Sequence, residues 1–152
     1  NIPAAKNMSR ILAIDYGKKR TGLAVTDVCQ LIANGLTTVA THELLDFVVN
    51  YVTRENVETV VIGMPVQMNG QPSENQARVT QFIQKLEAKL PKTLNIVQWD
   101  ERFTSVLAHQ AILQSGVSKM RRQKDKGLVD EISACIILQS YMDSKQFGAA
   151  GL

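Results

Sequence analysis

Short apolar runs and longer periodic stretches alternate along this chain, and they predict strands and helices respectively. The first run covers residues 11–14, which is too short for a helix, and it ends at Asp15. The segment 16–22 contains glycines, which tolerate the backbone angles of a tight turn. A second apolar run over 23–26 follows and ends at Asp27. This stretch therefore predicts a β-hairpin with a carboxylate at its base.

The rest of the chain continues with alternating strand and helix signals. The predicted elements are a strand over 31–40, a helix over 41–56, a strand over 57–65, a helix over 73–90, a last strand over 94–99, a short helix from 104 or 105 to about 115, and a final helix from Asp130 to about 144. Three strands joined by short turns, followed by strand–helix–strand crossovers, predict a mixed five-stranded sheet. Its first three strands are antiparallel and helices cover both faces. This α/β order is that of the ribonuclease H-like fold.

Helical periodicity predicts which side chains form the core. The helix over 41–56 has one apolar face, formed by Leu44, Leu45, Val48, Tyr51 and Val52. The helix over 73–90 starts with Ser73 and Gln76, which resemble a capping box, and its inward positions are Val79, Phe82, Ile83, Leu86 and Leu90. The final helix is apolar on more than one side, which predicts that it lies between the sheet and another layer.

Length and composition indicate one domain. The chain has 152 residues, enough for a substantial core, and we expect a single domain over 8–145. Residues 1–7 precede Met8 and are expected to be a leader or expression remnant, and 146–152 a flexible tail. No apolar run approaches the roughly 18–20 residues of a membrane span, so no membrane partner is expected. Two cysteines suggest neither a disulfide framework nor a metal site, which favours buried thiols and a cytoplasmic location.

Positive charge is concentrated rather than abundant. The formal net charge is only +3, but cations cluster in the predicted hairpin turn and again over 117–127, a predicted basic loop. Such clusters are often solvated loops, and they are also typical of nucleic-acid-binding surfaces. The candidate nucleic-acid-binding residues are Lys18, Lys19, Arg20, Arg102, Lys119, Arg121, Arg122, Lys124 and Lys126.

Acidic residues follow the first and last strands and open the final helix. They are Asp15, the adjacent Asp100 and Glu101, and Asp130. Each has an ordinary structural explanation, because turn acids bond nearby amides and acids favour helix N-termini. Strand geometry turns adjacent side chains to opposite faces, so only one of Asp100 and Glu101 is expected to enter a site, and the other can pair with Arg102. The carboxyl ends of central strands meet in one crevice, where we expect the acids to converge.

Converging carboxylates would repel one another unless a divalent cation compensated their charge. Oxygen ligands without cysteine or histidine favour Mg²⁺ or Mn²⁺, and His42 and His109 are isolated. Such a centre is suited to phosphodiester hydrolysis. The candidate catalytic residues are therefore Asp15, Asp100, Glu101 and Asp130, and the candidate metal ligands are Asp15, Glu101 and Asp130.

Four ordered motifs resemble the YqgF (RuvX) family. They are IDYGKKRTGLAVTD, VVIGMPVQMNG, DERFTS and VDEISACIIL, and the resemblance covers nearly the whole chain from Met8. It implies a small bacterial protein similar to Holliday junction resolvases, with a nuclease role in maturation of the 16S ribosomal RNA precursor. The family's acids fall on Asp15, Glu101 and Asp130. The chain departs from true junction resolvases at residues 63–65, where an acid is absent, and it has an additional acid, Glu131.

Several alternatives stay open. The expected partner is precursor ribosomal RNA, with branched DNA as the second substrate, and the expected assembly is a monomer or weak homodimer. A non-catalytic nucleic-acid-binding module is a different class of function, and retention of all three acids argues against it. An actin-like nucleotide-binding kinase also begins with a strand and an aspartate, but it needs two such domains and this chain is too short.

Overall fold

Five strands form one mixed sheet in the computed structural model, which describes residues 8–65, 69, 73–103, 110 and 126–149. The strands are β1 (Arg10–Asp15), β2 (Arg20–Thr26), β3 (Ala33–Ala40), β4 (Val57–Met64) and β5 (Asn95–Asp100). Their order is β3-β2-β1-β4-β5. The pairs β1–β2 and β2–β3 are antiparallel, and β1–β4 and β4–β5 are parallel. The predicted mixed sheet is therefore confirmed.

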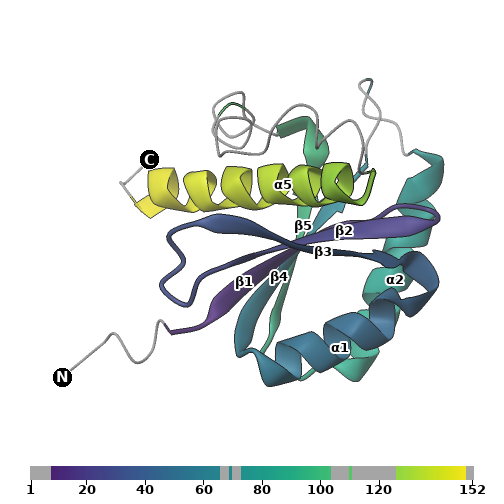
Figure 1. Ribbon diagram of the computed structural model, residues 1–152, viewed down its shortest axis with the longest axis horizontal. Coiled ribbons are helices and arrows are strands. Elements are labelled where there is room, and N and C mark those ends of the chain that lie inside the picture. The colour runs from purple at the N-terminus through teal and green to yellow at the C-terminus, as the bar shows by residue number, and fades with distance from the viewer. Residues whose placement is uncertain (1–7, 66–68, 70–72, 104–109, 111–125, 150–152) are drawn as a thin grey trace.

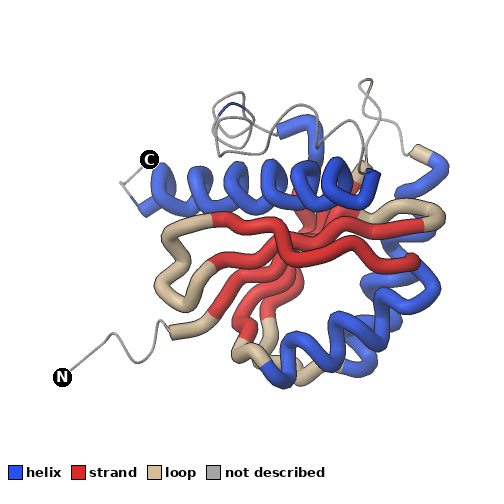
Figure 2. Tube along the Cα trace, viewed as in Figure 1, coloured by secondary structure: helices blue, strands red, loops and turns tan. Residues whose placement is uncertain are grey.

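Helices cover both faces of this sheet, as the sequence predicted. They are α1 (Leu44–Arg54), preceded by the 3₁₀ turn η2 (Thr41–Glu43), α2 (Glu74–Lys89), the 3₁₀ turn η3 (Glu101–Phe103) and α5 (Lys126–Ala149). Figures 1 and 2 show α1 and α2 on one face and α5 crossing the other. None of the helices in the described ranges has the length and apolar character needed to cross a membrane.

The central strand β1 divides its side chains between two cores. Leu12 and Ile14 belong to the core beneath α1 and α2, whereas Ile11 and Ala13 pack with residues of α5. This alternation is the ordinary period of a strand, in which successive side chains point to opposite faces. Because Asp15 follows Ala13 by two positions, the same alternation places Asp15 on the face that α5 covers.

The predicted apolar helix faces are confirmed. In α1 the buried residues are Leu44, Val48, Tyr51 and Val52, with Leu45 partly buried, and in α2 they are Val79, Phe82, Ile83 and Leu86, followed by Leu90. In α5 the residues from 134 to 138 are all buried, which agrees with a helix that is apolar on more than one side. The second layer predicted over this helix stays a prediction.

The ends of α5 differ from the prediction. The helix begins at Lys126, so Asp130 lies within its second turn rather than at its N-terminus, and Lys126 belongs to the helix rather than to a loop. It also runs past the predicted end at 144 to Ala149, so residues 146–149 of the predicted tail are helical. No proline interrupts this stretch, and a helix can include a glycine at a cost of about 1 kcal/mol.

Two local predictions were also wrong. The Ser73 side chain makes no cap bond, because its hydroxyl donates to the Pro65 carbonyl. The backbone amide of Gln76 donates to the backbone carbonyl of Ser73 at 3.1 Å. Cys135 is buried as expected, but Cys29 is exposed because it lies in the β2–β3 turn. The short helix predicted over 104–115 lies outside the described residues apart from 110.

Candidate active site

Asp15 ends β1 on the side of the sheet that α5 crosses. Its partner across the β1–β2 ladder is Gly22. A Cβ added to Gly22 would lie 2.1 Å from the carbonyl oxygen of Asp130 and 2.9 Å from its Cβ, so the helix backbone rests directly on this glycine. The close approach brings Asp130 over the strand position opposite Asp15.

Glu101 reaches the same face from β5. Val97 and Trp99 pack in the core with α5, and the strand alternation continues from them to Glu101 at the start of η3. A Cβ on Gly63 of β4 would lie 3.1 Å from the Oε2 atom of Glu101. The Glu101 carboxylate therefore extends over β4 toward β1. A larger side chain at position 63 would be crowded by Ile137, whose Cδ1 atom would lie 2.7 Å from the added Cβ, and by Glu101.

The pKa of Asp15 responds to the charges of the other two acids. Burial, which is the largest cause, and the negative charges of Glu101 and then of Asp130 together raise the pKa of Asp15 from 3.8 to about 7. Burial and the neighbouring Asp100 charge also raise the pKa of Glu101. The site thus holds uncompensated negative charge at the carboxyl ends of parallel strands, which is where ligands bind in α/β sheets.

Asp100 has a different environment from Glu101. Its carboxylate accepts hydrogen bonds from the Arg102 side chain, at 2.6 Å from Nη2 and 3.1 Å from Nε, and from the Arg102 backbone amide at 2.9 Å. These bonds hold the pKa of Asp100 below its ordinary value. Of the two adjacent acids, Glu101 is the one placed beside Asp15, whereas Asp100 is paired with Arg102.

Asp130 is also paired. The Arg20 guanidinium, at the start of β2, donates to the Asp130 carboxylate. Among the described side chains, no group of three histidine, cysteine or acidic residues is arranged to hold a metal ion as it stands. The ion pair with Arg20 gives a physical reason for this arrangement, since the Asp130 carboxylate is already neutralised by a cation of the protein.

A hydroxyl network that sequence reasoning missed holds the turn between β1 and β2. The Thr41 hydroxyl donates to the Gly17 carbonyl at 2.7 Å and lies 2.9 Å from the Thr21 hydroxyl, and the Gly17 amide donates to Thr21 at 3.3 Å. Thr21 is fully buried. A polar residue at an inward position of a predicted strand was therefore the signal in the sequence that could have indicated this network. The network fixes the turn that presents the exposed residues Lys18 and Lys19.

The remaining candidates lie apart from the cluster or outside the described residues. Glu131 lies over β3, because a Cβ on Gly35 would be 3.0 Å from its Oε1 atom. Since β3 is separated from β1 by β2, this extra acid is not beside Asp15. The candidates whose placement is not described are Lys119, Arg121, Arg122, Lys124 and His109, and the side chain of Lys126.

The raised pKa of Asp15 predicts a pH-dependent stability in the absence of divalent cations. The folded chain keeps the Asp15 proton up to about pH 7, whereas the unfolded chain releases it near 3.8. The folded state therefore binds more protons in this window, and its free energy of unfolding falls as pH rises from about 4 to 7. Chemical denaturation in EDTA across this range should show the fall, and Asp15→Asn should flatten it. An equal slope in both proteins would contradict the prediction.

Comparisons with known proteins show which family the chain resembles over most of its length. The family model described as "RuvX: Holliday junction resolvase" matches residues 9–144. A protein of Phocaeicola vulgatus named "Putative pre-16S rRNA nuclease" is 61% identical, over 92% of this chain and 99% of that protein. A Flavobacterium johnsoniae protein with the same name is 54% identical, over 92% of this chain and all of that protein, 100%.

A solved structure also matches the fold. It is Thermus thermophilus RuvC in complex with a Holliday junction substrate, with a TM-score of 0.59, 14% identity, and coverage of 92% of this chain and 96% of RuvC. At this identity the likeness concerns the fold alone, and together with the strand order it confirms the predicted ribonuclease H-like fold.

Proposed function

This chain belongs to the RuvX family, and we propose that it is a divalent-metal-dependent endonuclease that hydrolyses phosphodiester bonds of structured nucleic acid. One observation carries the proposal. Asp15, Glu101 and Asp130 come from β1, η3 and α5, and their charges meet on the same face of the sheet. A structural role for all three acids is a poor explanation, because burial and mutual repulsion make Asp15 costly to ionise.

The residues that would hold the metal are Asp15, Glu101 and Asp130. Their oxygen donors suit Mg²⁺ or Mn²⁺, and the unbalanced charge around Asp15 is what a divalent cation would offset. When bound, such a cation supplies an activated water and neutralises charge that develops on the phosphate. Arg20 would have to release Asp130, at least in part, for that carboxylate to become a ligand. Once released, Arg20 becomes available to the substrate phosphate.

The preferred substrate is the precursor of 16S ribosomal RNA, because two relatives that are 61% and 54% identical to this chain carry that activity in their names. A branched DNA junction is the second candidate, supported by the description of the family model.

Purified protein should therefore be incubated with precursor ribosomal RNA, a four-way DNA junction and plain duplex, each with Mg²⁺, with Mn²⁺ and with EDTA. Metal-dependent cutting of the precursor RNA supports the proposal. Absence of cutting with every substrate and metal would leave a binding module as the function.

The two adjacent acids provide a matched pair of variants. Glu101→Gln and Asp100→Asn each replace one carboxylate by its amide, but only Glu101 lies beside Asp15. We expect Glu101→Gln to lower the cleavage rate about 10²-fold or more, because loss of one metal ligand misplaces the reacting groups and a displacement of about 1 Å costs that much. Asp100→Asn should keep the rate within about threefold, since it weakens the ion pair with Arg102 and removes a charge beside Glu101 but leaves the Glu101 carboxylate in place. Single-turnover cleavage would measure both, and equal losses would contradict the assignment of Glu101 to the site.

A further inference from the structure

A second feature lies on the opposite side of the β1–β2 turn from the acids. It is a groove of about 370 Å³ between this turn and α2, here called the basic groove. Its charged and aromatic lining consists of Tyr16, Lys18, His42, Arg78, Phe82 and Lys85. None of the described residues that line it is an acid, so the groove has an unbalanced positive charge.

Arg78 is unusual among the arginines of the described ranges. The other four form ion pairs: Arg10 and Arg54 with Glu55, Arg20 with Asp130, and Arg102 with Asp100. Arg78 is half-buried and forms no ion pair with any described acid, and the same holds for Lys18 and Lys85 in the groove. A half-buried guanidinium without a carboxylate partner indicates a site where an external anion can bind.

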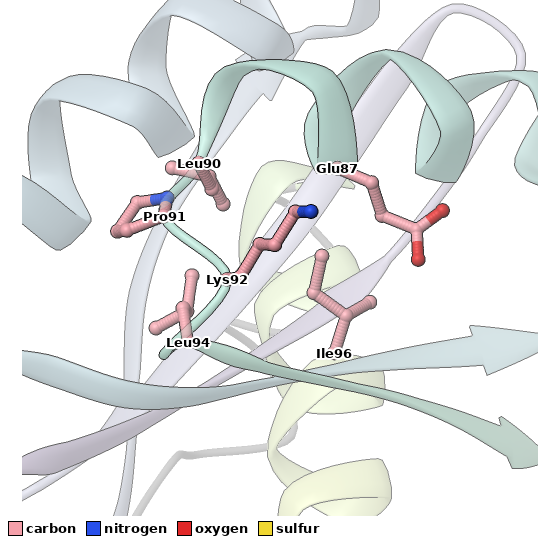
Figure 3. A pocket seen from close by; sticks show the side chains of 6 residues that line it. All are labelled: Glu87, Leu90, Pro91, Lys92, Leu94 and Ile96. Carbon is pink, nitrogen blue, oxygen red and sulfur yellow. The ribbon is translucent and has the colours of Figure 1, made fainter.

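A different groove shows the contrast. It has a volume of about 280 Å³ and lies where α2 ends and β5 begins (Figure 3). Lys92 lines this groove together with Glu87, and the rest of the lining is apolar except for backbone, with Leu90, Leu94 and Ile96 among its residues. Its charges offset each other, so it offers no comparable attraction for an anion.

The basic groove is connected to the acid cluster through consecutive residues. Asp15 faces α5, and the next residue, Tyr16, faces α2, where its ring centroid lies 5.5 Å from that of Phe82. The Asn75 side chain donates to the Tyr16 carbonyl at 3.1 Å and fixes the start of the turn to α2. Both features therefore lie at the end of the sheet where β1 finishes. Arg78 and Lys85 share one face of α2, about two helical turns or roughly 10 Å apart.

We infer that the basic groove binds the sugar–phosphate backbone of an RNA strand that continues from the phosphate held at the acid cluster. The inference rests on the proposed function for the identity of the strand. Lys18 lies nearest in sequence to the acids and contacts the first phosphate beyond them, and Arg78 and Lys85 contact the following ones. The roughly 10 Å between Arg78 and Lys85 allows the two cations to contact different phosphates of the same strand. The groove thus aligns the strand without reading its bases.

The test compares two double variants of the full chain that remove the same charges. Arg78→Ala with Lys85→Ala removes the cations of the groove. Arg54→Ala with Lys92→Ala removes one arginine and one lysine at the other end of the sheet, where β4 and β5 begin. The probe is a fluorescein-labelled RNA hairpin with a single-stranded extension, and a DNA hairpin of the same sequence is a second arm. Anisotropy in EDTA measures the dissociation constant from 0.05 to 0.5 M salt.

We expect the groove variant to bind the RNA about tenfold more weakly at 0.1 M salt and to lower the salt slope by about 1.4, for two lost phosphate contacts. The control variant should keep the wild-type slope, and both should melt as the wild type does. The inference would be overturned if the two variants showed equal effects, if the groove variant bound RNA as the wild type does, or if only DNA binding became weaker. It would also be overturned if the wild-type protein bound no RNA. An unchanged groove variant would instead favour an acidic protein surface as the occupant. Because the assay contains no metal, loss of binding supports the groove even if the wild type proves unable to cut RNA.

Discussion

Asp15→Asn should lower the rate of metal-dependent cleavage by about 10³-fold while the protein still folds and binds nucleic acid. The substitution keeps the size of the side chain and removes one negative charge. Asp15 is the most buried acid of the cluster and the one whose pKa responds to both Glu101 and Asp130. Loss of several kcal/mol of charge stabilisation at a metal centre corresponds to about three orders of magnitude in rate. Binding should survive, because Lys18 and Lys19 are unchanged, and it can tighten, since one charge facing phosphate is removed.

Cleavage, affinity and thermal melting should be measured on the same two preparations. A pKa of about 7 in place of 3.8 corresponds to about 4 kcal/mol of destabilisation above pH 7 in the absence of metal. The variant should therefore melt at a higher temperature than the wild type at pH 8 in EDTA, and Mg²⁺ should stabilise the wild type more than the variant. A lower melting temperature with proportionate loss of binding and cleavage would make Asp15 structural. Cleavage at the wild-type rate would remove it from the mechanism.

Much of the fold could be predicted because the apolar periodicity is strong where it decides the topology. Residues 11–14 contribute side chains alternately to the two cores, and the buried faces of α1 and α2 match the predicted positions. The ends of α5 could not be predicted in the same way. Local signals favoured Asp130 as a helix start, but the contact of the Asp130 backbone with Gly22 depends on a strand more than a hundred positions earlier in the chain. Tertiary packing of this kind overrides weak local propensity.

The acids of the candidate site could be named from their places after two strands and at the predicted start of the final helix, but their ion-pair partners could not. The alternation along β5 separates Asp100 from Glu101 only when the exact last residue of the strand is known, and strand ends are the least certain part of a sequence-based prediction. The contact of Arg20 with Asp130 joins residues 110 positions apart, so no local pattern indicated it. Arg78 and Lys85 were missed because they are ordinary polar positions of an amphipathic helix, and only the groove distinguishes them.

Gly22→Ala should destabilise the protein and disable the site at once. A methyl group on Gly22 would lie 2.1 Å from the Asp130 carbonyl oxygen and 2.3 Å from its carbonyl carbon, distances that real Cβ atoms do not adopt. Both are backbone atoms, so no side-chain rotation relieves the clash, and α5 must shift away from β2. Overpacking of this kind costs about 3 kcal/mol, which lowers the melting temperature of a chain of this size by about 6–12 °C. The same shift moves Asp130 away from Asp15.

Gly35→Ala is the matched control, because it adds the same methyl group beneath the same helix on the neighbouring strand. Its Cβ would meet the Glu131 carboxylate oxygen at 3.0 Å and the Glu131 Cβ at 3.4 Å, and the flexible end of that side chain can move aside. We expect it to cost less than about 1 kcal/mol and to leave cleavage near the wild-type rate. In Gly22→Ala, cleavage should fall about 10²-fold even at temperatures where the variant is fully folded, since a displacement of about 1 Å at a reacting group costs that much. Melting curves and single-turnover rates on both variants measure the difference. Equal stability and equal rates in the two variants would show that the close contact of α5 with Gly22 does not position Asp130.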